Sequence, residues 1–165
     1  MIFATSNVNA ACADPRGFKF GAAQKMQFLQ HPNAIGQGNN NTSIVGLWHV
    51  TYTSQGQLFF ESLDQWHSDG TEFENANGAP AIGNVCFGVW KQLGPRTVQL
   101  SHIGWNFNPD GSSAGYFTLT ETNTVSADGN TYQGTFDYKA YDVDGNFIEG
   151  YEVAGAQTAV RITVN

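Results

Sequence analysis

Three side chains on neighbouring runs of alternating residues could carry acid–base chemistry: His102, Glu121 and Tyr138. Each falls on the more apolar face of its run, while the threonines at 118, 120, 122 and 124 fall on the opposite face. A histidine can act as general acid or base, a carboxylate can orient it, and a tyrosine hydroxyl can donate to a developing oxyanion. The alternative is structural: His102 and Glu121 satisfy each other, because burying an unpaired polar group costs roughly 2 to 7 kcal/mol.

Residues 61 to 74 form the densest polar and aromatic segment, which holds a further candidate catalytic residue, His67. Two facings of this segment are open. With Trp48 inward and a two-residue loop at Gln55-Gly56, the inward set is Phe59, Glu61, Leu63, Gln65 and His67, followed by Glu72 and Glu74. The opposite facing places Phe60, Ser62, Asp64, Trp66 and Phe73 inside, which buries more apolar area. A single β-bulge would decide between the two.

The first facing would bring His67 and Glu72 together with His102 and Glu121. Imidazole and carboxylate groups are ligands of divalent metals. These four residues come from separate strands, however, and the chain lacks the closely spaced histidine pair that marks many metal sites. We therefore predict neither a metal nor an organic cofactor.

A second group of candidate residues would form the wall of a ligand pocket. Gly88, between Cys86 and Trp90 on one face of its strand, leaves room for a ligand or for another backbone. An aromatic wall with a polar minority is typical of small-molecule pockets. The residues expected to contact a ligand are Tyr52, Asp64, Trp66, Trp90, Trp105, Phe117, Leu119 and Phe136.

Hairpin turns must position these side chains, and four Asp-Gly pairs, at 69–70, 110–111, 128–129 and 144–145, are predicted to form type I′ turns. They separate eight predicted strands, at 44–54, 57–67, 71–76, 84–92, 96–107, 114–126, 131–142 and 146–164. Consecutive antiparallel strands predict an all-β, up-and-down barrel, because closure leaves no unpaired edge. Two-residue loops would set His102 opposite Leu119 and Leu119 opposite Tyr138, all facing inward.

The first 43 residues differ from the barrel domain at 44–165. They are rich in Gly, Asn and Pro, and predict an N-terminal arm or lid with one short helix near 21–30 and a linker at 36–43. The two cysteines, Cys12 and Cys86, either form a disulfide that ties the arm to the sheet or are two small buried residues. Both readings stay open.

The composition of the 165-residue chain narrows its partners and its class. Only seven residues are Lys or Arg, the net charge is −7, and no basic cluster occurs, so nucleic acid is not an expected partner. No stretch has the roughly 20 apolar residues of a membrane helix, so we expect no membrane insertion. The low charged fraction and the many Gly, Asn and Thr residues are typical of an exported protein. We expect a secreted or periplasmic one whose signal peptide is absent from this sequence.

Several enzyme classes lack support in the sequence. It contains no phosphate-binding glycine loop, no Gly-x-Ser-x-Gly elbow and no Cys-x-x-Cys pair. Nucleotide-dependent and serine hydrolase chemistry are therefore not expected.

The first barrel strand opens on Gly46-Leu47-Trp48, and the last strand carries Arg161. This pattern resembles the lipocalin and calycin family of small barrels. The resemblance implies that Trp48 plugs the closed end of the barrel and that the Arg161 guanidinium stacks on its indole. The turn at 144–145 leaves no room for the helix that lipocalins carry between their last two strands. Allene oxide cyclase and dirigent-type barrels are thus also considered, on architecture alone.

Three functions follow as hypotheses. The first is a binding protein for a hydrophobic or aromatic small molecule. The second is a cofactor-independent isomerase, cyclase or lyase in which His102 and Glu121 move protons. The third is an exported interaction protein, a homodimer in which the N-terminal arm docks on the neighbouring subunit.

Overall fold

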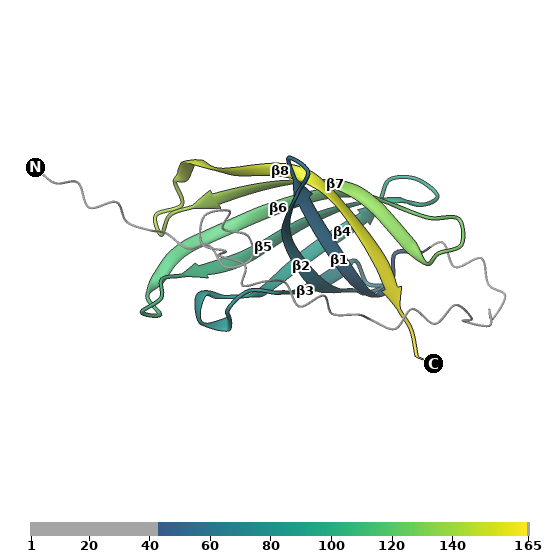
Figure 1. Cartoon of the computed structure of the whole chain (residues 1–165), viewed down its shortest axis with the longest axis horizontal. Helices are drawn as coiled ribbons and strands as arrows, with labels where there is room; N and C mark the ends of the chain where they lie inside the picture. Colours follow the sequence, from purple (N-terminus) through teal and green to yellow (C-terminus); the bar gives the residue numbers. More distant parts are fainter. Residues whose placement is uncertain (1–42, 165) are drawn as a thin grey trace, which may run out of the picture.

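The chain forms a closed antiparallel barrel of eight strands (Figure 1). The computed structural model describes residues 43–164. The strands are β1 (Gly46–Ser54), β2 (Gln57–Trp66), β3 (Thr71–Ala76), β4 (Val85–Gln92), β5 (Thr97–Phe107), β6 (Ser113–Val125), β7 (Thr131–Tyr141) and β8 (Phe147–Ile162). Each strand pairs with the next, and β8 pairs with β1. The predicted all-β barrel is confirmed, whereas the predicted helix at 21–30 lies outside the described residues.

The hairpin turns differ from the predicted type. A type I′ turn needs positive φ at both central residues. Within residues 43–164 only Gln55 (φ 51°), followed by Gly56 (φ 76°), fulfils this requirement. At the four Asp-Gly pairs the glycine alone has positive φ. The prediction of type I′ turns there was wrong, and the one such turn is the Gln55-Gly56 loop.

Three of these aspartates, Asp69, Asp110 and Asp128, stabilise longer loops, and Asp142 does so in the fourth turn. The carboxylate of Asp69 accepts a hydrogen bond from the backbone N–H of Thr71 at 2.9 Å, and Asp110 accepts one from Ser112 at the same distance. This side-chain contact mimics a turn of the backbone. The loop around Asp69 closes with a hydrogen bond from His67 N–H to Thr71 O at 2.9 Å, so it contains three residues.

The predicted pairing of β5, β6 and β7 is nevertheless confirmed. His102 lies opposite Leu119, and Leu119 lies opposite Tyr138. A three-residue loop at Asp110 would by itself shift the register by one residue. A bulge between Asn106 and Phe107 restores it.

The facing of β2 and β3 combines the two alternatives left open by the sequence. Between Tyr52 and Thr53 the register with β2 shifts by one residue, which leaves Phe59 as the extra residue of a bulge. Beyond that bulge Asp64 and Trp66 point into the barrel, as in the second facing. The three-residue loop then pairs Trp66 with Glu72. Glu72 and Glu74 therefore also point inward, as in the first facing, and Phe73 does not.

One end of the barrel is closed as the resemblance implied. Trp48 is fully buried, and the Arg161 guanidinium carbon lies 4.1 Å from the centre of its ring. Arg161 also donates hydrogen bonds to the carbonyls of Ser43, Val45 and Gly129 at 2.7 to 2.8 Å. The charge is thus held over the indole, where a cation–π contact contributes roughly 0.5 to 2 kcal/mol.

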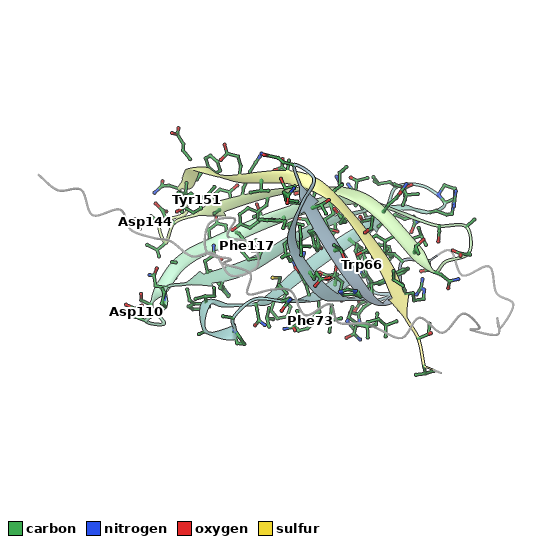
Figure 2. All side chains as sticks on the ribbon, viewed as in Figure 1. Trp66, Phe73, Asp110, Phe117, Asp144 and Tyr151 are labelled. Carbon is green, nitrogen blue, oxygen red and sulfur yellow. The ribbon has the colours of Figure 1, made fainter. Side chains whose placement is uncertain are left out.

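Aromatic side chains fill the remainder of the apolar core. The rings of Tyr52 and Phe60 stack at 4.1 Å between centroids, and those of Phe117 and Tyr138 stack at 5.3 Å. Figure 2 shows Phe117 and Trp66 among the side chains enclosed by the strands, with the Asp110 and Asp144 turns together at one end.

Candidate functional site in the barrel lumen

Four carboxyl groups point into the lumen from three strands. Asp64 comes from β2, Glu72 and Glu74 from β3, and Glu121 from β6, and each is at most 2% exposed. The alternation of a β-strand places residues two apart on the same face, which explains the pair on β3. Buried charges are costly unless they are paired or neutralised. The arrangement of these four groups is therefore a property that a purely structural core does not need.

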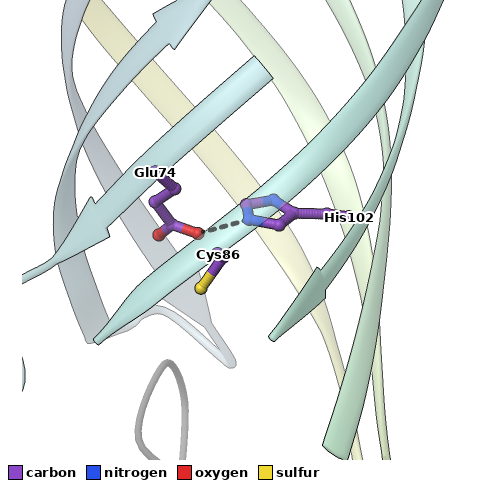
Figure 3. Close-up of side chains that lie close together, drawn as sticks. All are labelled: Glu74, Cys86 and His102. Atoms are coloured by element: carbon purple, nitrogen blue, oxygen red, sulfur yellow. Dashed lines mark ion pairs between the residues drawn. The ribbon is translucent and has the colours of Figure 1, made fainter. Parts of the chain in front are cut away.

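His102, on β5, lies between two of these carboxyl groups. Its Nε2 atom is 2.9 Å from Glu74 Oε2 (Figure 3), and its Nδ1 atom is 3.9 Å from Glu72 Oε2. All three side chains are completely buried. His102 faces inward as predicted, but the carboxyl group in contact with it belongs to Glu74 and not to Glu121. An imidazole with an acid beside each nitrogen can pass a proton from one side to the other.

Glu121 and Asp64 belong to a hydrogen-bonded network on the other side of the lumen. The Tyr52 hydroxyl is 2.7 Å from Glu121 Oε1 and 3.5 Å from Asp64 Oδ2. The Tyr132 hydroxyl lies 3.4 Å from the same Asp64 oxygen, and Ser62 donates to Asp64 Oδ1. The remaining Glu121 oxygen accepts from Asn123, which in turn accepts from Gln157. These two acids thus have partners within the protein.

Glu72 differs from them because neither of its oxygens has a hydrogen-bond partner. Gly88 faces it across the β3–β4 ladder, and a Cβ atom at Gly88 would lie only 2.7 Å from Glu72 Oε2. The space that the sequence assigned to a ligand beside Gly88 is therefore occupied by the Glu72 carboxyl group. Trp66, paired with Glu72 in the β2–β3 ladder, also has a buried indole N–H without a partner.

Burial raises the pKa of all four acids. Burial, reinforced by the charges of Asp64, Glu74 and Glu121, raises the pKa of Glu72 to about 11. Burial raises the pKa of Glu74 to about 8, and raises those of Asp64 and Glu121 as well. Burial lowers the pKa of His102. At neutral pH the lumen therefore holds a neutral imidazole beside the protonated carboxyl groups of Glu72 and Glu74, which can donate hydrogen bonds.

The structure gathers most of the predicted ligand-contact residues in the lumen and excludes two candidates. The side chains of the following residues are buried inside: Tyr52, Asp64, Trp66, Phe117, Leu119, Phe136 and Tyr138. Trp90 is partly buried, with its ring 6.0 Å from that of Trp66. Trp105 is 64% exposed, because it occupies an odd position of β5 and the even positions face inward. His67 is exposed in the β2–β3 turn, because β2 ends one residue earlier, at Trp66.

Glu74 and the Ser62, Asn123 and Gln157 side chains were not among the predicted site residues. The sequence signal that could have found Glu74 is its spacing of two from Glu72. This spacing identifies Glu74 only once the facing of β3 is known, because a one-residue change of register moves every side chain of the strand to the opposite face of the sheet. Gln157 could not be placed because β8 also contains a register shift opposite Lys139 and Tyr141.

Glu74, His102 and Cys86 form the one group of three metal-type ligands among residues 43–164, with donor atoms within 4.8 Å of one another (Figure 3). Metal binding by cysteine requires a thiolate. Cys86 is not a free cysteine, so one imidazole and one carboxylate remain, fewer than the three or four ligands of protein metal sites. Cys12 lies outside the described residues, and its pairing with Cys86 stays a prediction.

A hollow of about 180 Å³ lies beside β2 and β3. It is lined by His49, Glu61, Ser62, Leu63, Asn75, Ala76, Asn77, Gly78 and Asn84. Its volume is below the roughly 300 to 1,000 Å³ of typical ligand pockets. The lumen is the stronger candidate.

The fold and the site together define an eight-stranded antiparallel barrel with an acidic lumen. No family model, no curated protein and no solved structure matches the chain. Among the described residues, no helix is long and apolar enough to cross a membrane. Function must therefore be argued from the lumen itself.

Proposed function

We propose that the barrel binds a small organic molecule in its lumen, largely apolar or aromatic and carrying a basic nitrogen that contacts Glu72. The observation that carries this proposal is the Glu72 carboxyl group, which is completely buried and has no hydrogen-bond partner on either oxygen. Most buried polar groups in proteins are hydrogen-bonded, and an unsatisfied one costs about 1 to 3 kcal/mol. A ligand that donates to Glu72 removes that cost.

The charge of the surroundings favours a basic ligand over an acidic one. Asp64, Glu74 and Glu121 surround Glu72, and His102 is the only basic side chain among them. A neutral ligand amine can accept a hydrogen bond from the protonated Glu72 carboxyl group, whereas an anionic ligand would be buried beside these acids without a cationic partner. The aromatic rings of the core suit the apolar part of such a ligand, and a ring face also attracts a cation.

Binding can be measured through the fluorescence of Trp66, which is buried next to Glu72 in the β2–β3 ladder. Arylmethylamines and the matched arylmethanols are titrated into the full chain. We expect the amines to bind at least about tenfold more tightly, equivalent to about 1.4 kcal/mol. Glu72→Gln should remove this preference, whereas Glu61→Gln, on the outer face, should keep it. Equal binding of amines and alcohols would contradict the proposed contact between a basic nitrogen and Glu72. Absence of binding by both would contradict the ligand site in the lumen.

A second function, acid–base catalysis on the bound molecule, is favoured by the position of His102. Its Nε2 atom lies 2.9 Å from Glu74 and its Nδ1 atom lies on the side of Glu72. In a cofactor-independent isomerase, cyclase or lyase, His102 would accept a proton from the substrate while a protonated carboxyl group returns one. Tyr138, also buried in the lumen, would hold the developing negative charge by a hydrogen bond, and the charge of Glu121, which acts to raise the pKa of His102, would stabilise the protonated imidazole.

Proton transfer can be detected by incubating a bound molecule with the protein in D₂O and following deuterium incorporation by mass spectrometry. Wild type should catalyse the exchange. His102→Ala should abolish it, Glu121→Gln should slow it, and His49→Ala should leave it unchanged because His49 lies on the outer face. Exchange that survives His102→Ala would remove His102 from this role. The ligand-binding proposal would remain intact in that case.

A further inference from the structure

Exposed apolar side chains gather on the outer surface of β4 and β5. Val89 is 62% exposed, Phe87 60%, Ile103 48% and Trp105 64%. Phe87 lies opposite Ile103 in the β4–β5 ladder, so the two side chains are neighbours on the outside. The surface continues onto β3 and β6, where the Phe73 ring lies 5.5 Å from Phe87 and the Tyr116 ring 6.5 Å from Trp105. We call these residues, with Val85, the outer apolar face.

This surface is almost free of charge, although the chain has a net charge of −7. The outward positions of β3, β4, β5 and β6 carry Thr, Ser, Asn, Gln, apolar and aromatic residues. Lys91, near the end of β4, is the single charged residue among them. Acidic side chains on the outside lie on other strands, for example Glu61 on β2 and Asp137 on β7.

We propose that the outer apolar face is the contact between two copies of this chain. From the exposed fractions and the size of aromatic side chains, the face offers roughly 500 to 600 Å² of apolar surface. Monomers rarely expose a contiguous apolar patch of more than a few hundred Å², and a standard interface buries about 800 Å² on each partner. With its polar rim of threonines the face is large enough for such an interface.

The absence of charge selects a second copy as the occupant. A symmetric dimer brings the same residues together twice, so every charge on the contact would meet its like. Two molecules of net charge −7 repel each other least where their surfaces are neutral. A different protein would be recognised with the help of complementary charges, which this face does not offer. The barrel has no free edge, so contact occurs between side chains of two sheet faces.

The test measures the mass of the full chain in solution by light scattering and sedimentation. Wild type should be a dimer at micromolar concentration. Ile103→Glu and Phe87→Glu should each weaken dimerisation by at least about a hundredfold, because each places two buried charges across the axis. Val160→Glu is the matched control. Val160 is 41% exposed on the outside of β8, away from this face, and its variant should remain a dimer.

Two further readouts keep the proposal falsifiable. Circular dichroism should show the same spectrum for all variants, since the altered residues are exposed. Acrylamide should quench Trp105 more strongly in Ile103→Glu than in wild type, because the dimer covers this indole. A wild type that is monomeric at millimolar concentration, or a dimer unaffected by both face variants, would overturn the proposal. A monomer whose Trp105 is protected only by phosphatidylcholine vesicles would also overturn it and indicate a lipid surface.

Discussion

Replacing Glu74 by Gln should remove a pH-dependent loss of stability. Burial raises the pKa of Glu74 from 4.5 to about 8, so the folded protein keeps a proton that the unfolded chain releases above about pH 4.5. Where the folded state binds more protons, stability falls as the pH rises. For Glu74 this fall begins near the unfolded pKa and is complete near pH 8. Glutamine cannot ionise, so Glu74→Gln should not show it.

The magnitude follows from the width of that interval. Each pH unit between the two pKa values contributes about 1.4 kcal/mol, so the interval from 4.5 to about 8 sets an upper limit of about 5 kcal/mol. Near pH 4 the two proteins should have similar stability, because the acid is then protonated in both states. Near pH 8 the variant should be more stable than wild type by a few kcal/mol. Glutamine also keeps a polar group close to His102 Nε2.

The assay is equilibrium unfolding in guanidinium chloride, followed by circular dichroism between about pH 4 and pH 8. Glu61→Gln is the matched control, because Glu61 forms a histidine–glutamate pair with His49 at 3.4 Å, but on the outer face. Its stability should run parallel to that of wild type. If the stability of Glu74→Gln also fell in parallel with wild type over this range, the reasoning about a buried, protonated Glu74 would be refuted.

Three other substitutions test the packing that positions the site. Gly88→Ala should destabilise the protein by about 1 to 3 kcal/mol in thermal unfolding, because its Cβ would lie 2.6 Å from Leu100 and 2.7 Å from Glu72; an unchanged melting temperature would contradict the close contact. Arg161→Ala should cost about 2 to 4 kcal/mol through the loss of three hydrogen bonds to carbonyls and of the stacking on Trp48, and Arg161→Lys should recover only part of it. Gln55→Gly should stabilise the barrel by about 0.5 to 1 kcal/mol in urea unfolding, since Gln55 has positive φ; destabilisation would argue against the type I′ turn.

The strand order could be predicted from the sequence because turn residues and alternation are local signals. The inward facing of His102, Leu119 and Tyr138 followed from two agreeing lines, the threonine alternation of β6 and the pairing across two loops. The turn type at Asp110 was wrong, yet the pairing was right, because the longer loop and the bulge at Asn106 shift the register in opposite directions.

The acidic part of the lumen could not be predicted because it depends on two single-residue shifts. The bulge at Phe59 turns Asp64 inward, and the three-residue loop before Thr71 turns Glu72 and Glu74 inward. Apolar burial alone favours Phe73 inside, since its ring is larger and costs nothing to desolvate. This sequence instead buries two glutamates, although burial of apolar side chains would give the more stable core. Such departures are expected at functional sites.

The most direct test of ligand binding in the lumen is the ¹H–¹⁵N spectrum of the four indole groups during titration with an arylmethylamine. Trp66 has a buried indole N–H without a hydrogen-bond partner, next to Glu72, whereas Trp105 lies on the outside. The Trp66 signal, assigned with Trp66→Phe, should shift on binding while the Trp105 signal stays in place. A shift confined to Trp105 would place binding on the outer face and contradict a ligand site in the lumen.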